Sequence, residues 1–201
     1  MQLERFVNGR ARSNAYVYAP NDEGDRPALL VDAGVGAADK VIDLVMAEGL
    51  TPKAVVLTHG HPDHIWTARQ LSDRFEIPAY MHRRDFRWFL VRRPRPRRLE
   101  PLDGGDHLNA GPIGVDVIHT PGHSGGSVCF VLDGLCFSGD TVMSGTVGQT
   151  MFPGGNSVAL RESIRSKLLP LPDDLKLLPG HGGDTTVGAE RELWKRFTKG
   201  E

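Results

Sequence analysis

Residues 54–64, Ala-Val-Val-Leu-Thr-His-Gly-His-Pro-Asp-His, set the architecture of this chain. The first four are apolar and predict a buried strand, which is followed by a loop and then by a helix over about 64–75. The loop carries three histidines and one aspartate: His59, His61, Asp63 and His64. Imidazole nitrogens and carboxylate oxygens suit zinc, iron or manganese, and the absence of cysteine ligands argues against a closed structural zinc site. The stretch therefore predicts a metal site at the end of a strand.

Three further segments repeat this arrangement, each a strand followed by a tight, glycine-containing turn that carries a possible ligand. They are Thr120-Pro121-Gly122-His123, Ser138-Gly139-Asp140-Thr141 and Pro179-Gly180-His181-Gly182. Glycine allows such turns to approach a metal closely. With the first loop they supply five histidines and two aspartates, which make two four-ligand sets if one ligand is shared. A lone histidine is usually a surface or core residue, so the prediction of a two-metal site depends on the joint pattern.

The remaining histidines and the two cysteines have simpler interpretations. Three histidines lack this setting and are expected to be structural or solvated: His82, His107 and His119. Cys129 and Cys136 lie in apolar runs joined by Asp133-Gly134, which predicts a two-residue hairpin turn. In that register Val131 faces Cys136, so the cysteines are diagonal neighbours near the upper distance limit for a disulfide. We expect buried free thiols, as in a reducing compartment.

The composition is that of an ordinary globular protein. The chain has 201 residues, 39% of them hydrophobic, and a formal net charge of -1. These values favour one domain over residues 1–201, and they are not typical of a disordered or nucleic-acid-coating protein. No apolar run approaches the roughly 20 residues that cross a bilayer, and the N-terminal residues do not lead into a signal core. We therefore expect a cytoplasmic protein with no membrane partner.

Strand and helix patterns are mixed along the whole length of the chain. Strands are predicted over residues 15–19, 28–32, 54–57, 79–81, 115–118, 128–132, 135–138 and 175–178. Helices are predicted over residues 38–48, 64–75, 84–91, 157–169 and 189–197, with Asn156 as an N-cap. Runs of adjacent strands broken by single helices favour an α+β fold in which two sheets pack together with helices outside.

An arginine-rich segment is the one outlier in composition. Residues 83–98 contain eight arginines and a single acidic residue. A solvated helix and loop is the simplest interpretation. In a second interpretation, Arg83, Arg84 and Arg87 form a clamp beside the pocket that binds an anionic thiol carrier. In a third interpretation, the segment contacts the phosphates of RNA. Three aromatic residues on the same segment are expected to lie in the core: Phe86, Trp88 and Phe89.

Taken together, the motifs resemble the metallo-β-lactamase superfamily and, within it, the hydroxyacylglutathione hydrolase (glyoxalase II) branch. The matching segments are Val31-Asp32-Ala33-Gly34, residues 58–64, 120–124, 137–141 and 179–182, with Thr185, Thr186 and Glu190. The resemblance implies an αββα sandwich with the metals at one edge. It implies one ion held by His59, His61 and His123, and a second held by Asp63, His64 and His181. In this scheme Asp140 bridges both ions.

The resemblance also limits the substrate. Zinc-dependent β-lactamases of the common type usually have a cysteine at the position of Asp140, so antibiotic hydrolysis is not the expected role. Glutathione-specific relatives carry a lysine and a tyrosine where this chain has Gln149 and Met151, which we take as candidate substrate contacts. Trp66 stands where the family often has glycine. Glutathione specificity is therefore not expected.

The expected reaction is hydrolysis of an acyl thioester or ester by two divalent ions, with zinc as the first expectation and iron or manganese as alternatives. Two close ions lower the pKa of a bridging water so that it supplies hydroxide near neutral pH, and they polarise a carbonyl oxygen. Asp63 is expected to orient the water as well as bind metal, while Asp140 holds both ions. Asp32 is a candidate acceptor for the second ring nitrogen of a histidine ligand. The expected partner is a small-molecule substrate, such as an anionic thiol conjugate.

Two other reactions are compatible with the same motifs. A persulfide dioxygenase shares them but binds one iron through two histidines and one aspartate. A phosphodiesterase or ribonuclease would use the arginine-rich segment for phosphate contacts, although this chain lacks room for the large inserted domains of such nucleases. Metal content and oxygen uptake separate the hydrolase from the oxygenase.

Overall fold

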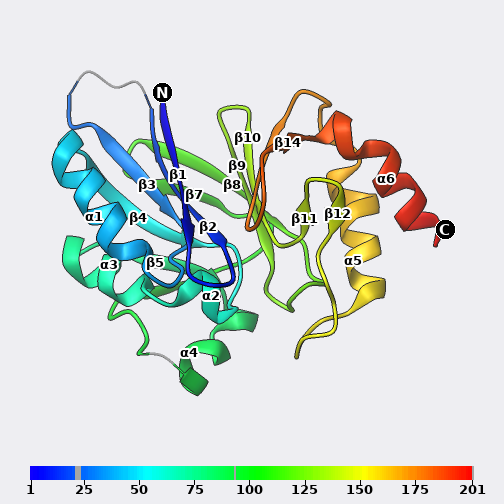
Figure 1. Cartoon of the computed structure of the whole chain (residues 1–201), viewed down its shortest axis with the longest axis horizontal. Helices are drawn as coiled ribbons and strands as arrows, with labels where there is room; N and C mark the ends of the chain where they lie inside the picture. The colour runs from blue at the N-terminus through cyan, green and yellow to red at the C-terminus, as the bar shows by residue number, and fades with distance from the viewer. Residues whose placement is uncertain (21–23, 93, 201) are drawn as a thin grey trace.

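The computed structural model of the chain describes residues 1–20, 24–92 and 94–200. Its framework is a pair of six-stranded sheets (Figure 1). The first sheet has the spatial order β1 (Gln2–Asn8), β2 (Ser13–Ala19), β3 (Pro27–Val31), β4 (Thr51–Leu57), β5 (Ala79–His82) and β6 (Leu99–Leu102). The second has the order β14 (Thr185–Thr186), β13 (Lys176–Pro179), β10 (Leu135–Gly139), β9 (Val128–Leu132), β8 (Ile113–His119) and β7 (His107–Ala110). A separate hairpin pairs β11 (Val142–Met143) with β12 (Thr146–Val147).

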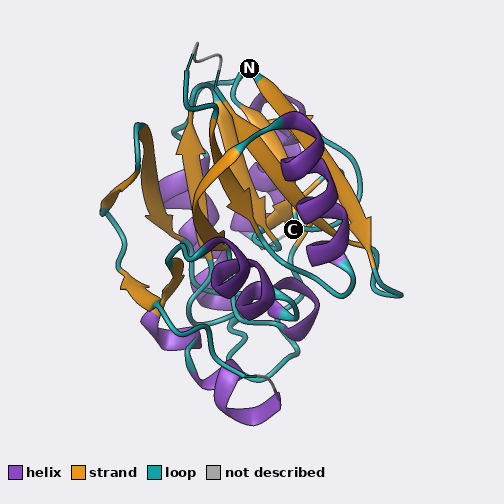
Figure 2. Cartoon of the chain, turned by 90° about the vertical axis from the view of Figure 1, so that its left-hand side faces the viewer, coloured by secondary structure: helices purple, strands orange, loops and turns teal. Residues whose placement is uncertain are grey.

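Helices cover the outer face of each sheet, as Figures 1 and 2 show. The first sheet is covered by α1 (Ala37–Glu48) and α3 (Ala68–Phe75). The second is covered by α5 (Ser157–Ser163), the π-helical turn η2 (Ile164–Leu168) and α6 (Val187–Lys199). Three short helical segments complete the described elements: α2 (Pro62–Ile65), the 3₁₀ turn η1 (Arg83–Asp85) and α4 (Arg87–Arg92). The predicted αββα sandwich of the α+β class is confirmed.

Three apolar clusters separate these four layers. Every residue of β2 is buried, as a strand covered on both faces requires. Successive side chains of a strand point to opposite faces, so Val17 packs toward the helices of the first sheet while Tyr16 and Tyr18 pack between the sheets. Leu160 and Trp194 fill the third cluster, between the second sheet and its helices.

Each predicted strand is present, but two predicted helices are wrong as single elements. The pattern over residues 84–91 divides into the 3₁₀ turn η1, which ends at Asp85, and α4, which begins at Arg87. The pattern over residues 64–75 divides into α2, which ends at Ile65, and α3, which begins at Ala68. The backbone N–H of Thr67 donates to the carbonyl of Ala33 at 2.8 Å, and its hydroxyl also donates to that carbonyl. Because Thr67 uses its N–H in this way, the helical hydrogen-bond ladder is interrupted there. The prediction of Asn156 as an N-cap is confirmed, since its side chain accepts from the N–H of Ala159.

One smaller prediction is also met. Cys129 and Cys136 are buried free thiols, and Val131 faces Cys136 in the pairing of β9 with β10. Within the described part of the chain, no helix combines the length and the apolar character needed to cross a membrane.

Candidate metal centre

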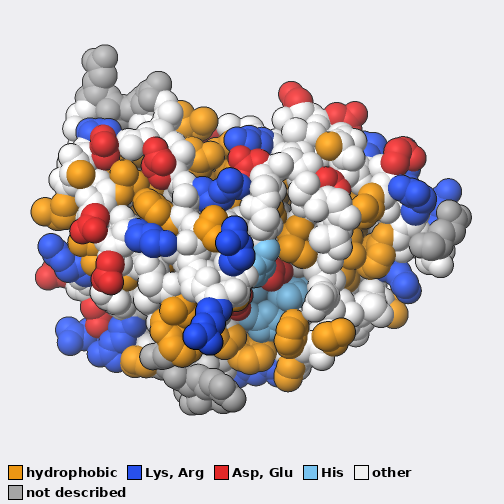
Figure 3. All heavy atoms as spheres, in the orientation of Figure 1, with side chains coloured by type: hydrophobic (Ala, Val, Ile, Leu, Met, Phe, Trp, Pro, Cys, Tyr) orange, Lys and Arg blue, Asp and Glu red, His pale blue; other side chains and the backbone are white. Residues whose placement is uncertain are grey.

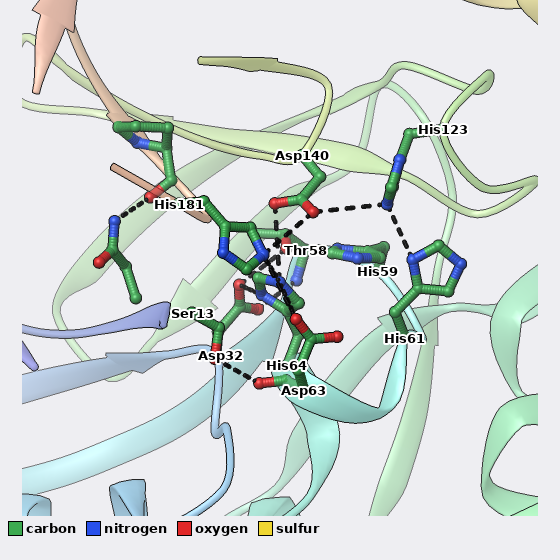
Figure 4. A network of polar contacts seen from close by, with 12 residues as sticks. Ser13, Asp32, Thr58, His59, His61, Asp63, His64, His123, Asp140 and His181 are labelled. Carbon is green, nitrogen blue, oxygen red and sulfur yellow. Dashed lines mark hydrogen bonds and ion pairs between the residues drawn. The ribbon is translucent and has the colours of Figure 1, made fainter. Parts of the chain in front are cut away.

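The seven predicted ligands meet at one edge of the sandwich, where strands of both sheets end (Figure 4). Four come from the loop and first helical turn after β4 in the first sheet: His59, His61, Asp63 and His64. Three come from the turns after β8, β10 and β13 in the second sheet: His123, Asp140 and His181. Because β10 and β13 are parallel neighbours, their carboxyl ends bring Asp140 and His181 close together. Ligands far apart in the sequence therefore converge through the sheet topology.

The ligand atoms form three overlapping groups, and all atoms of a group lie within 4.8 Å of one another. The groups are His59, His61 and His123; His59, His64 and Asp140; and Asp63, His64 and His181. Nε2 of His123 is 2.8 Å from Nδ1 of His61, and Nε2 of His64 is 3.2 Å from Nε2 of His181. Nitrogen ligands about 2 Å from a tetrahedral zinc ion would lie about 3.3 Å apart. The spacing is therefore close to that of ligands that share an ion.

Asp140 reaches histidines on both sides of this cluster. Its Oδ2 atom lies 3.5 Å from Nε2 of His123 and 3.4 Å from Nε2 of His181. Its Oδ1 atom lies 3.6 Å from Nε2 of His64. Gly180 makes this approach possible, because a Cβ atom at residue 180 would overlap Oδ1 of Asp140. The carboxylate has the position that the predicted bridge requires.

Several buried polar atoms in the cluster lack a hydrogen-bond partner among the described residues. Two of them are Nε2 of His59 and Oδ1 of Asp140. Nε2 of His61 is also unpaired, but it is Nδ1 of that ring that faces His123. Unpaired buried polar atoms are costly, and native proteins contain few of them. Divalent cations would satisfy the lone pairs of imidazole and carboxylate ligands together. The residues present therefore fit a pair of metal ions.

Contacts outside the ligands determine which ring nitrogens carry hydrogen. Thr58 donates its N–H and its hydroxyl to Asp32, at 2.8 and 2.9 Å. The Thr58 oxygen is then left to accept from Nδ1 of His59 at 3.1 Å. Nδ1 of His64 donates directly to Asp32 at 2.8 Å. In the neutral form of both rings the lone pair that a metal needs is then on Nε2, and the prediction of Asp32 as an acceptor is confirmed.

The histidines fall into two groups, according to whether their pKa values are lowered or raised. Burial lowers the pKa of His61 to about 4 and lowers the pKa of His59 well below its usual value. Burial also acts to lower the pKa values of His64 and His181, but the neighbouring carboxylates, including Asp140, outweigh it. They raise the pKa of His64 to about 9 and that of His181 to about 10. Metal binding to this second pair of rings therefore competes with protons.

Asp85 is a functional residue that sequence reasoning missed. Its side chain is fully buried in η1. Its Oδ2 accepts from the N–H of Gly60 at 2.9 Å and from the hydroxyl of Ser124 at 2.6 Å, and its Oδ1 accepts from the N–H of Gly126 at 3.0 Å. One carboxylate thus ties the loop of His59 and His61 to the turn of His123. The only signal in the sequence was that Asp85 is the single acidic residue in the arginine-rich segment.

The arginines of the predicted clamp do not line the cavity over the ligands. Arg83 pairs with Asp103 at 2.5 Å, and Arg84 is exposed. The guanidinium of Arg87 lies against Gly154. Of the other arginines in the segment, Arg93 and the side chain of Arg92 lie outside the described residues.

The cavity over the ligand atoms has a volume of about 700 Å³. Figure 3 shows histidine side chains in this hollow, with hydrophobic side chains beside them. Its lining consists of His61, Pro62, Asp63, Trp88, His123, Asp140, Met143, Gln149, Phe152, Pro153 and His181. Gln149, a candidate substrate contact, belongs to the lining, and its backbone carbonyl accepts from Nδ1 of His123 at 2.7 Å. The other candidate contact, Met151, is 80% exposed and is not part of the lining.

Comparisons with known proteins agree with this geometry. The family model of the metallo-β-lactamase superfamily matches residues 8–181. Hydroxyacylglutathione hydrolase GloC of Haemophilus influenzae is 31% identical, over 84% of this chain and 86% of its own length. The crystal structure of the BLEG-1 B3 metallo-β-lactamase is 33% identical, with a TM-score of 0.85 over 95% of this chain and 97% of that one. TTHA1623, solved in a di-iron-bound form, is 34% identical, with a TM-score of 0.79 over 93% of this chain and 96% of that one.

A two-sheet sandwich with a histidine and aspartate cluster at one edge defines a metallo-hydrolase type of site. The chain belongs to the metallo-β-lactamase superfamily, because the family model matches most of its length. The resemblance seen in the sequence is confirmed at this level, and the likeness to GloC fits the hydroxyacylglutathione hydrolase branch.

Proposed function

We propose that the chain is a dinuclear metal-dependent hydrolase that cleaves acyl thioesters or related esters. The observation that carries this proposal is the position of Asp140, whose two oxygens reach histidines on both sides of the cluster. The name of GloC, a hydroxyacylglutathione hydrolase, supports a thioester substrate. The di-iron form of TTHA1623 supports two ions. Zinc is the proposed metal, with iron or manganese as alternatives.

The metal ions and Asp63 would have different roles in the reaction. Two divalent ions, when bound, would supply hydroxide near neutral pH and polarise the carbonyl oxygen of the substrate. Asp63 lines the cavity, and its Oδ2 lies 3.3 Å from Nε2 of His181 and 3.5 Å from Nε2 of His64. Its carboxylate can therefore hold a water proton as well as bind metal. No serine or cysteine lines the described cavity, and a thiolate leaves without strong acid catalysis.

Hydrolysis of S-lactoylglutathione and a panel of other acyl thioesters by the zinc-loaded protein tests this proposal. Replacing the ligands with His59→Ala or Asp140→Asn should lower kcat/KM by more than about 100-fold, since loss of even an outer partner of a metal ligand costs about 10–100-fold. His107→Ala, at an exposed histidine far from the cluster in sequence, is the matched control. Turnover that is absent for every thioester, or unchanged in both ligand variants, would exclude a metal-dependent thioesterase.

β-Lactam hydrolysis is a second candidate, because BLEG-1 carries the name of a B3 metallo-β-lactamase and resembles this chain over almost its whole length. An aspartate at residue 140, where β-lactamases of the common type have a cysteine, counts against it. A kcat/KM for a chromogenic cephalosporin above that for every thioester would favour this candidate. One iron per chain with oxygen uptake on a persulfide would instead assign the oxygenase.

A further inference from the structure

Two aromatic rings contact the ligand His61. The ring of Trp88 lies 5.0 Å from the His61 ring, centroid to centroid, and the two planes are at 86°. The ring of Phe152 lies 5.4 Å from the His61 ring, at 66°. Trp88 belongs to α4 and Phe152 to the segment after β12, so distant parts of the chain supply the two rings. The sequence predicted Trp88 as a core residue, but it is only half-buried and also lines the cavity.

These two rings and three further residues are the apolar part of the cavity lining. We call these apolar lining residues the aromatic wall, and they are Pro62, Trp88, Met143, Phe152 and Pro153. No lysine or arginine belongs to the described lining, and the charged or titratable residues there are the candidate metal ligands alone. The cavity therefore combines the polar candidate ligands, where the reacting group would bind, with an apolar lining that contacts one of them, His61. Such a combination suits a substrate with a neutral apolar substituent next to the reacting bond.

The aromatic wall leaves apolar surface open to solvent. Phe152 is 48% exposed, although large hydrophobic side chains are usually covered. A concave apolar surface beside a polar cluster is typical of a ligand-binding site. Nε1 of Trp88 is buried and has no hydrogen-bond partner among the described residues. The indole is therefore placed by packing rather than by a polar contact.

Packing on both sides holds the aromatic wall in place. A Cβ atom at Gly60 would overlap Cδ1 of Trp88, so the glycine allows the indole to lie directly on the ligand loop. Asp85, three residues before Trp88, accepts the N–H of the same glycine. On the other side, the guanidinium of Arg87 lies against Gly154, two residues after Phe152. A binding surface supported in this way is preorganised relative to the metal ligands.

We propose that the aromatic wall is an acyl subsite, so that the substrates are thioesters with a neutral, apolar acyl group of several carbons. This inference rests on the proposed hydrolase function. Water adds to the thioester carbonyl, the C–S bond breaks, and the products are the carboxylic acid and the thiol. The thiol half points away from the wall, because an anionic carrier would meet no lysine or arginine in the described lining. The exposed Arg84, outside the cavity, is available to such a carrier.

A chain-length series tests the acyl subsite. Acyl thioesters of one neutral thiol, N-acetylcysteamine, are compared from acetyl to octanoyl with the zinc-loaded protein. Each added methylene should raise kcat/KM by up to about fourfold until the wall is covered, as expected for transfer of a methylene out of water. Trp88→Ala and Phe152→Ala should flatten this dependence, so that kcat/KM falls more, relative to wild type, for the octanoyl thioester than for the acetyl thioester. Met46→Ala, at an exposed apolar residue of α1, should keep the wild-type slope.

A binding measurement separates the subsite from catalysis. S-alkyl thioethers of N-acetylcysteamine cannot be hydrolysed, and calorimetry gives their affinity for the zinc-loaded protein. Affinity should increase with alkyl length in wild type and in Met46→Ala, but not in Trp88→Ala.

The outcomes distinguish the two levels of the proposal. If no thioester of any length is hydrolysed, the proposed function fails. If thioesters are hydrolysed but neither kcat/KM nor affinity depends on acyl or alkyl length, only the acyl subsite fails. A dependence on the length of the thiol in a series of acetyl thioesters would also overturn the assignment of the wall to the acyl group.

Discussion

Asp85 shows how far the centre depends on a residue outside the ligand set. It accepts hydrogen bonds from Gly60, Ser124 and Gly126, which belong to two different ligand-bearing segments. Its carboxylate is fully buried, so solvent water does not serve these three donors as an alternative acceptor. The residue therefore positions His61 and His123 relative to each other through their backbones.

Asp85→Ala leaves the backbone N–H groups of Gly60 and Gly126 without an acceptor, whereas the hydroxyl of Ser124 still has Ser127 at 2.8 Å. We expect the free energy of unfolding to fall by about 3 kcal/mol and zinc affinity to fall by about 10–100-fold. Urea unfolding and zinc titration measure the two effects. Asp103→Ala, at a half-exposed aspartate, is the control. Equal losses in both variants would mean that Asp85 has no special role.

His82 gives a prediction about pH. Its ring stacks on that of His119 at 4.0 Å, and burial, followed by the neighbouring His119, lowers the pKa of His82 to about 4. The unfolded chain has an ordinary histidine pKa of about 6.5. Between these values the unfolded state binds more protons, so the free energy of unfolding falls as the pH drops from about 6.5 to 4. We expect a contribution of about 1–2 kcal/mol.

Urea unfolding across this pH range measures the contribution of His82. His82→Gln should reduce the loss of stability on acidification, whereas His107→Gln, at an exposed ring, should not. A wild-type slope that persists in His82→Gln would assign the pH dependence to other groups.

At the scale of elements, buried strands and the turns that follow them were the predictable part. The apolar run before Thr58 could only be a buried strand, and β4 is buried from Ala54 to its end at Leu57. All seven candidate ligands were identified because each lies at or just after such a strand end. The local sequence contains this information, because the spacing of apolar residues and the residues that form a turn are both properties of a short segment.

Elements that depend on distant contacts were not predictable. The mixed pattern of β1 is stabilised by pairing with β2, and β14 has only two residues. The break between α2 and α3 follows from the bonds of Thr67 to Ala33, 34 residues earlier. The roles of Asp85 and Trp88 likewise arise only when the chain folds, because their partners lie on other segments.

The turn after β13 gives a prediction at this scale. In Gly180→Ala the new methyl group would overlap Oδ1 of Asp140 and lie 2.7 Å from Cε1 of His64. We expect both ligands to be displaced, with kcat/KM for a thioester lowered by more than about 10-fold. Gly183→Ala, where a Cβ atom meets open space, is the matched control. Activity equal to the control would show that the turn can adjust.

At the scale of the whole molecule, the centre joins the two sheets. The start of β2 supports both halves: the hydroxyl of Ser13 donates to the carbonyl of Asp63 at 2.7 Å, and the side-chain amide of Asn14 donates to the carbonyl of Pro179 at 2.8 Å. Asp140 lies at the end of a strand of the second sheet, and its carboxylate approaches His64, which lies after β4 of the first sheet. Metal binding would therefore link the two halves of the sandwich and stabilise the native state.

Metal stoichiometry tests the central claim, that Asp140 joins two metal sites. Wild-type protein and Asp140→Asn are dialysed against the same buffered zinc, and elemental analysis gives the number of ions per chain, with circular dichroism to check the fold. We expect two ions per wild-type chain and one or fewer in a folded Asp140→Asn variant. A single ion in the wild type, or two ions retained in the variant, would contradict the account.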